Sequence, residues 1–122
     1  ELYQEIVVCL EHPESRVRTQ AIYTLTEIFN EDTSKKLLDR FQSEEYQNQL
    51  AILKAVKKIG DEADLPRLQG LLVTEDLEMK LSVVRAMANL SQSGIELLMA
   101  CPQSQSYPLN EIITQVKSEI SI

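Results

Sequence analysis

The chain is 122 residues long and carries a formal charge of −7, with 43% apolar but only 5% aromatic residues. This length suits one domain with a continuous core, and a core of Leu, Ile, Val and Ala favours packed helices over a β-sandwich. The negative charge argues against general binding to nucleic acid or anionic membrane, and the longest apolar run, residues 6–10, is far shorter than the roughly 20 residues that span a bilayer.

The first two predicted elements are helices over about 2–11 and 14–29, because apolar residues recur there at helical spacing. His12 and Pro13 separate them, since proline disfavours helical conformation in the residue before it and readily starts a new helix. Glu14 and Arg18 lie four residues apart on the second helix, so a weak ion pair between them is predicted.

Further helix pairs are predicted over about 34–42 with 45–59, about 64–73 with 76–92, and about 95–100 with 108–120. Gly60 and Gly94 are interpreted as left-handed residues that end helices. Pro66 fits the first turn of its helix, where a missing amide costs nothing. The last helix is interpreted as a closing cap.

The chain aligns with itself at a step of 31 residues, which indicates a helical repeat. The matched positions are apolar in all three copies: Ile22, Leu53 and Val84; Leu25, Val56 and Met87; Ile28, Ile59 and Leu90; Ala21, Ile52 and Val83. An earlier helix repeats at the same step, through Ile6, Leu37 and Leu68 and through Leu10, Phe41 and Leu72. Each copy is therefore predicted to be a helix pair that buries its apolar stripe by stacking on its neighbours.

Two segments carry a family resemblance. Residues 15–28, with their early Val-Arg pair, resemble the second helix of a HEAT repeat, and residues 59–72, an Ile-Gly-Asp turn followed by a proline-containing helix, resemble the junction into the next repeat. The short period is most similar to the bacterial HEAT-like repeats of the phycobilin-lyase (PBS-lyase) type. The Val-Arg pair is replaced in the two later copies, by Asn48-Gln49 and by Met79-Lys80.

The resemblance implies an all-α fold, a right-handed α-α superhelix (HEAT-like solenoid) of about four stacked helix pairs with an extended concave surface. The repeats are expected at about 1–30, 31–61, 62–93 and 94–122, within a single domain that covers residues 1–122. The chain begins with Glu1 and enters a helical pattern without a cap, so we expect it to be the carboxy-terminal part of a longer protein. This architecture serves many purposes, and the resemblance is therefore nearly silent on function.

Residues that could perform chemistry lack the partners that catalysis requires. Residues 61–64 spell Asp-Glu-Ala-Asp, as in helicases, but no Gly-rich phosphate-binding loop accompanies them, so they are interpreted as an acidic helix cap. His12 is the only histidine and is interpreted as a solvated loop residue. No residue supports the phycobilin lyase activity that the repeat type would imply.

Two further groups of reactive side chains are interpreted as structural. Cys9 and Cys101 lie in apolar helical segments without an adjacent base, which is the setting of inert packing cysteines. Adjacent carboxylates such as Glu44 and Glu45 are interpreted as solvated caps, because general acid catalysis needs burial. We therefore predict no enzymatic activity, no bound metal and no cofactor.

The outward side of the second helices is the candidate binding surface. If Ala21, Leu25 and Ile28 face the core, residues 16, 20, 23 and 27 face outward. The 31-residue step then predicts a basic strip on the concave face, formed by Tyr23, Lys54 and Arg85, by Glu27, Lys58 and Asn89, and by the neighbouring Lys57. Tyrosine and basic residues are common at interface centres, so the strip suits a protein segment that carries carboxylates, although an ordinary solvated helix face would show the same pattern.

These patterns together predict a protein-protein interaction or scaffolding module that is monomeric and makes no membrane contact through this segment. Its partner is expected to be a protein, with an acidic segment as one candidate. Its expected location is cytoplasmic, or the cytosolic side of a membrane-anchored protein. Two alternatives stay open: a nucleic-acid-binding HEAT-like domain, as in helical-repeat DNA glycosylases, which the net charge opposes, and an accessory domain that regulates an attached enzyme.

Overall fold

The computed structural model describes residues 2–90, 92–100 and 118–119, and every regular element in this part of the chain is helical. The predicted all-α class is therefore confirmed. The chain divides into two compact units, Glu1–Gly60 and Asp61–Ile122, which we call the N-terminal and C-terminal units.

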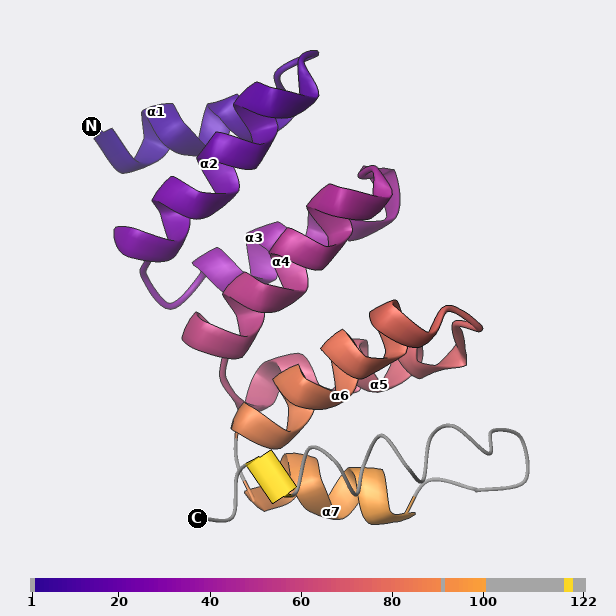
Figure 1. Ribbon diagram of the computed structural model, residues 1–122. Helices are drawn as coiled ribbons and strands as arrows, with labels where there is room; N and C mark the ends of the chain where they lie inside the picture. The colour runs from indigo at the N-terminus through magenta and orange to yellow at the C-terminus, as the bar shows by residue number, and fades with distance from the viewer. Residues whose placement is uncertain (1, 91, 101–117, 120–122) are drawn as a thin grey trace. The chain divides into compact units, whose positions relative to one another are not determined.

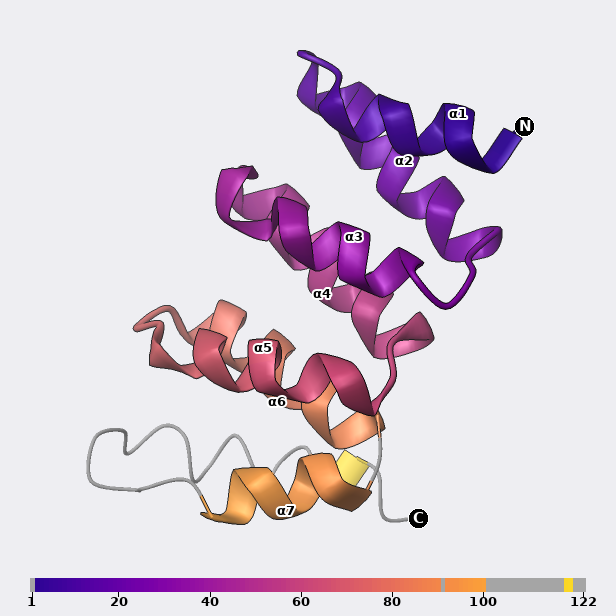
Figure 2. The ribbon, with the colours of Figure 1, turned by 180° about the vertical axis from the view of Figure 1, so that it is seen from behind.

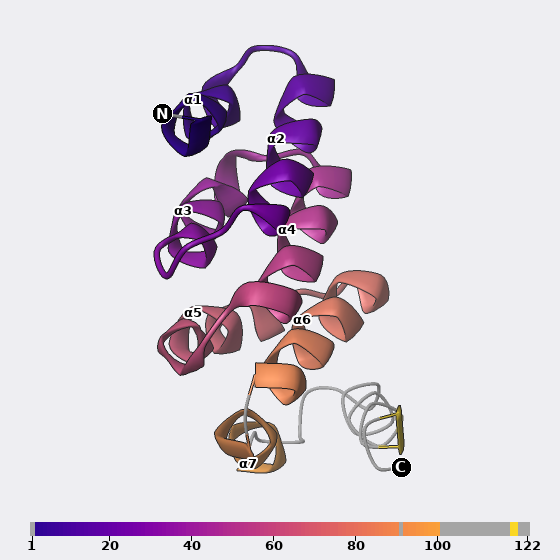
Figure 3. The same cartoon turned by 90° about the vertical axis from the view of Figure 1, so that its left-hand side faces the viewer.

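The N-terminal unit consists of two helix pairs. The elements of the first pair are α1 (Leu2–Val8), its 3-10 extension η1 (Cys9–Glu11) and α2 (Ser15–Glu27), and those of the second pair are α3 (Thr33–Arg40), its extension η2 (Phe41–Ser43) and α4 (Tyr46–Ile59). The opposite views in Figures 1 and 2 and the side view in Figure 3 show two layers, with α1 and α3 in one and α2 and α4 in the other. Within the second layer, α2 packs along α4.

The C-terminal unit is centred on α6 (Leu77–Leu90). The 3-10 turn η3 (Glu62–Asp64), helix α5 (Leu65–Gly70) and the 3-10 turn η4 (Leu71–Val73) come before α6, and α7 (Gln92–Ala100) follows it. Both α5 and α7 pack against α6. The predicted helix over 108–120 lies outside the described residues, apart from the helical residues 118–119.

The helices recur with the predicted period. The second helices α2, α4 and α6 begin at residues 15, 46 and 77, which are 31 residues apart. The equivalent core residues share one environment, because the following six side chains have no exposed surface: Ile22, Leu53, Val84, Leu25, Val56 and Met87. The repeated apolar stripe therefore forms the core of each unit.

Acidic residues precede each second helix, as the sequence predicts. Only the Asp76 side chain caps its helix, with Oδ1 accepting from the Met79 amide at 2.8 Å, whereas the Glu14 and Glu45 side chains make no capping hydrogen bond at the starts of α2 and α4. Asp61 and Asp64 form a capping box at η3, in which the Asp61 side chain accepts from the Ala63 amide at 3.0 Å. The acidic run 61–64 thus serves as a helix cap.

The two glycines differ from the expectation. Gly60 ends α4, but its φ of −75° and ψ of 175° are extended rather than left-handed. Gly94 lies inside α7, so its interpretation as a helix end was wrong. A Cβ atom at Gly94 would come within 1.9 Å of the Met87 carbonyl oxygen, which shows that the missing side chain permits a close approach of α7 to the backbone of α6.

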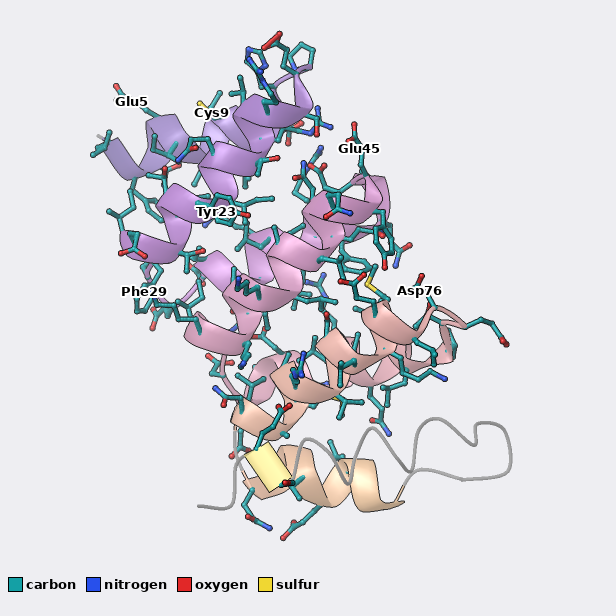
Figure 4. All side chains as sticks on the ribbon, in the orientation of Figure 1. Glu5, Cys9, Tyr23, Phe29, Glu45 and Asp76 are labelled. Carbon is teal, nitrogen blue, oxygen red and sulfur yellow. The ribbon has the colours of Figure 1, made fainter. Side chains whose placement is uncertain are left out.

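Side chains at both ends of the N-terminal unit join its two helix pairs. At one end, the Tyr3 hydroxyl lies 2.7 Å from the Thr33 hydroxyl, which is fully buried. At the other end, near Glu45 in Figure 4, Arg18 Nε lies 3.0 Å from Glu44 Oε2. Arg18 therefore pairs with Glu44 in the next helix pair, and the expected local pair with Glu14 was wrong.

Glu44 is buried, which corrects its interpretation as a solvated cap. Its side chain is only 1% exposed, and Arg40 Nη2 lies 3.8 Å from Glu44 Oε2. Asn48 donates from Nδ2 to Glu44 Oε1 at 2.9 Å and accepts from the Thr19 hydroxyl. Asn48 occupies the position that Val17 has in the first repeat, and its amide supplies a hydrogen bond to the buried Glu44 carboxylate.

Candidate functional site

The outward face of α2 carries the residues that the helical spacing places there. Arg16, Gln20, Tyr23 and Glu27 are all exposed, whereas Ala21 and Leu25 on the opposite side are buried. Figure 4 turns this face toward the viewer, with Tyr23 labelled on α2. The pattern follows from the helical repeat, since residues three or four apart share one side of a helix.

A hollow of about 440 Å³ lies on this face between α2 and α4. Eight of its lining residues are the same four positions of the two helix pairs, shifted by 31 residues: Gln20, Tyr23, Thr24 and Glu27 on α2, and Ala51, Lys54, Ala55 and Lys58 on α4. Thr26 completes the lining. We call this feature the α2–α4 hollow, and it is a direct product of the repeat because the two parallel helices present equivalent faces side by side.

The α2–α4 hollow combines a small apolar floor with a mixed rim. Ala51 and Ala55 are 7% and 4% exposed, and their short side chains leave space between the helices. Tyr23 is 51% exposed, so its side chain is accessible to a ligand. Lys54 is exposed, and no carboxylate among the described residues pairs with its ammonium group. The hollow can therefore take an apolar group and an anion together.

Glu27 and Lys58 form an ion pair across the α2–α4 hollow, with Lys58 Nζ 3.1 Å from Glu27 Oε2. Glu27 is the last residue of α2, where the partial negative charge of the helix end disfavours a carboxylate. The lysine of the next helix pair compensates this charge. Lys58 is thus less available to a partner than the basic strip implied.

The remaining residues of the basic strip are not gathered at this hollow. Lys57 is exposed on α4 outside the lining. Arg85 and Asn89 lie on α6 in the C-terminal unit, and Arg85 Nη2 is 2.9 Å from Glu119 Oε2. Arg85 is therefore already neutralised by a carboxylate of its own chain, which the sequence interpretation did not foresee.

The interpretation from sequence missed the alanines and threonines of the hollow. Ala51 and Ala55 flank Lys54 on one helix face, and Thr24 is the equivalent of Ala55 on α2. Small residues one turn apart on an outward face were the available signal, because they leave a depression between neighbouring helices. Charged and aromatic residues alone do not reveal this depression.

In the described part of the chain, the other reactive side chains do not form a catalytic or metal-binding cluster. His12 is an exposed loop residue whose Nδ1 accepts from the Glu14 amide at 3.0 Å, and Cys9 is half-buried in η1, while Cys101 lies outside the described residues. The described residues contain no group of three His, Cys, Asp or Glu residues placed to hold a metal ion. None of the helices described is both long and apolar enough to cross a bilayer.

Comparisons with protein-family models, curated proteins and solved structures found no match for this chain.

Proposed function

We propose that this chain is a protein-interaction or scaffolding module of the HEAT-like type, in which the outward face of the second helices receives a protein partner. The observation that carries the proposal is the α2–α4 hollow, which joins the exposed Tyr23 ring, an alanine floor and Lys54, whose ammonium group pairs with no carboxylate in the described ranges. Interface centres are rich in aromatic anchors that enter or border such depressions. Binding rather than catalysis is the role that these side chains support.

The proposal includes a right-handed α-α superhelix for the whole chain. The recurrence of second helices at residues 15, 46 and 77 and the burial of equivalent residues in each copy support it. In that arrangement every additional helix pair would extend the receiving surface by one more outward face.

Site-specific photo-crosslinking in the source cells tests the proposed surface. A photoreactive benzoylphenylalanine replaces Tyr23 in one variant and Lys35 in a control, since Lys35 lies on α3 in the other layer of the N-terminal unit. We expect an adduct of defined mass from the Tyr23 variant and none from the control. A missing adduct at Tyr23, or equal adducts from both positions, would remove this face from consideration.

A further inference from the structure

We infer that the α2–α4 hollow binds a short peptide segment in which an Asp or Glu side chain pairs with Lys54 while a neighbouring apolar side chain covers the Tyr23 ring. This inference rests on the proposed function and deepens it, because it names the chemistry of the partner at the same hollow. It also assigns the recognition to the N-terminal unit alone, without a contribution from Arg85.

The charges that line the hollow favour an acidic ligand. Two lysines and one glutamate line the hollow, and Lys58 is already held by Glu27 at 3.1 Å. In the part of the chain that the structure describes, Lys54 is thus the lining cation without a carboxylate partner, and it remains for a ligand. The chain as a whole carries 19 acidic and 12 basic residues, so Lys54 attracts a peptide carboxylate against a net negative background. A local positive charge on a net negative protein favours binding of an acidic peptide at this site over non-specific binding elsewhere.

The shape of the hollow favours an aliphatic side chain beside that carboxylate. The hollow measures about 440 Å³, which lies within the range of natural ligand pockets of about 300–1,000 Å³. Its floor of Ala51 and Ala55 is apolar, and the Tyr23 ring stands beside it. A branched aliphatic side chain can lie against this floor, and burying it supplies affinity that an exposed ion pair alone does not.

The same features disfavour a nucleic acid as the occupant. A phosphate backbone requires several cations in a row, and its affinity rises with the number of phosphates neutralised. Among the described residues the hollow offers one lysine, Lys54, that no carboxylate pairs with, and the Glu27 carboxylate also lines the hollow, where it holds Lys58. A single side-chain carboxylate fits this arrangement better than a run of phosphates.

The test is a titration of the full 122-residue chain, followed by the shifts of its backbone amide signals in nuclear magnetic resonance spectra. The probe is a capped hexapeptide with one Glu next to one Leu in a Gly-Ser background, and the matched peptide has Gln in place of Glu. The protein variants are Lys54→Gln and the control Lys35→Gln. A single-stranded hexanucleotide is titrated in parallel, and sedimentation of the free protein reports self-association.

We expect the Glu peptide to shift the amide signals of residues around Tyr23 and Ala55, and to bind about twofold to fivefold more tightly than the Gln peptide at low salt, as for an exposed ion pair. Lys54→Gln should remove this preference and Lys35→Gln should keep it. High salt should also reduce the preference, because it screens an exposed pair.

Equal binding of the two peptides by the native chain would overturn the inference, and so would a preference that survives in Lys54→Gln. Tighter binding of the hexanucleotide at the same amides, or occupation of the hollow by a second copy of the chain, would also overturn it. A crosslink from the Tyr23 position without a preference for Glu would end this inference and leave the proposed function standing. If neither the crosslink nor any peptide-induced shift appeared, the peptide inference and the proposed function would both be wrong.

Discussion

Arg18 and Glu44 form an ion pair that joins the two helix pairs of the N-terminal unit, with Arg18 Nε 3.0 Å from Glu44 Oε2. The Glu44 side chain is 1% exposed and the Arg18 side chain 13%, so water compensates little of either charge. Asn48 and Arg40 complete the surroundings of this carboxylate. The pair therefore helps to fix α2 against α4 and, with it, the walls of the α2–α4 hollow.

Replacing Glu44 by Gln should lower the free energy of unfolding by about 3 kcal/mol, because the largely buried Arg18 charge loses its nearest carboxylate. Urea denaturation followed by circular dichroism measures the change. Glu45→Gln is the matched control, since the Glu45 side chain is 64% exposed and lies 3.8 Å from Arg18, and it should cost less than about 1 kcal/mol. Equal losses in the two variants would show that burial does not decide the strength of this pair.

Tyr3→Phe should lower the free energy of unfolding by about 1 kcal/mol. The Tyr3 hydroxyl lies 2.7 Å from the buried Thr33 hydroxyl and donates to Asn30 Oδ1 at 3.3 Å, and phenylalanine removes both contacts. Tyr23→Phe is the control, because Tyr23 is 51% exposed. Thermal unfolding of the two variants should therefore separate them, and identical midpoints would contradict the role of Tyr3.

Gly94→Ala should weaken the packing of α7 on α6. The added Cβ atom would lie 1.9 Å from the Met87 carbonyl oxygen, so the backbone of one helix has to move, at a cost of about 1–3 kcal/mol. Gly70→Ala offers a matched control within the same unit, because its added Cβ meets nothing within 4 Å apart from its chain neighbours and its own helix backbone. That control should be neutral or stabilising by up to about 1 kcal/mol. Hydrogen exchange of α7 amides measures the difference, and protection unchanged in Gly94→Ala would contradict the close approach.

Glu27→Gln should increase the affinity for the Glu-containing peptide by about twofold to fivefold, because it releases Lys58 to the ligand. Stability should change by less than about 1 kcal/mol, since the side chains of Lys58 and Glu27 are 60% and 70% exposed. The same peptide titration measures this gain. Weaker binding would indicate that Glu27 itself contacts the ligand.

Much of the fold could be predicted from the sequence because the repeat states the same pattern three times. The second helix of the first pair was expected over about 14–29 and spans Ser15–Glu27, and residues such as Leu25, Val56 and Met87 are buried as their common position requires. The apolar stripe recurs on the same helix face every 31 residues, so the sequence indicates which side chains are buried.

The polar contacts were harder to predict, for physical reasons that differ from case to case. Glu44 is followed by another acid at a helix start, which usually indicates solvation, and its main partner Arg18 is 26 residues away. Arg85 pairs with Glu119, which is 34 residues away and therefore outside the 31-residue phase. The Glu27–Lys58 pair could have been predicted from the sequence, since the two residues are 31 apart and opposite in charge.

The α2–α4 hollow exists because α2 and α4 present equivalent positions to the same side. This alignment determines where the chain can accept an inserted residue and still bind its ligand. One residue inserted in α4 ahead of Lys54 would rotate the rest of that helix by about 100°, turning the lysine away from Tyr23 and aiming an aliphatic neighbour at the solvent. An insertion in the connection 28–32 leaves both helices in register with their own cores. Loop-length variants should therefore keep their ligand, whereas a single extra residue within either helix should abolish recognition even if the chain still folds.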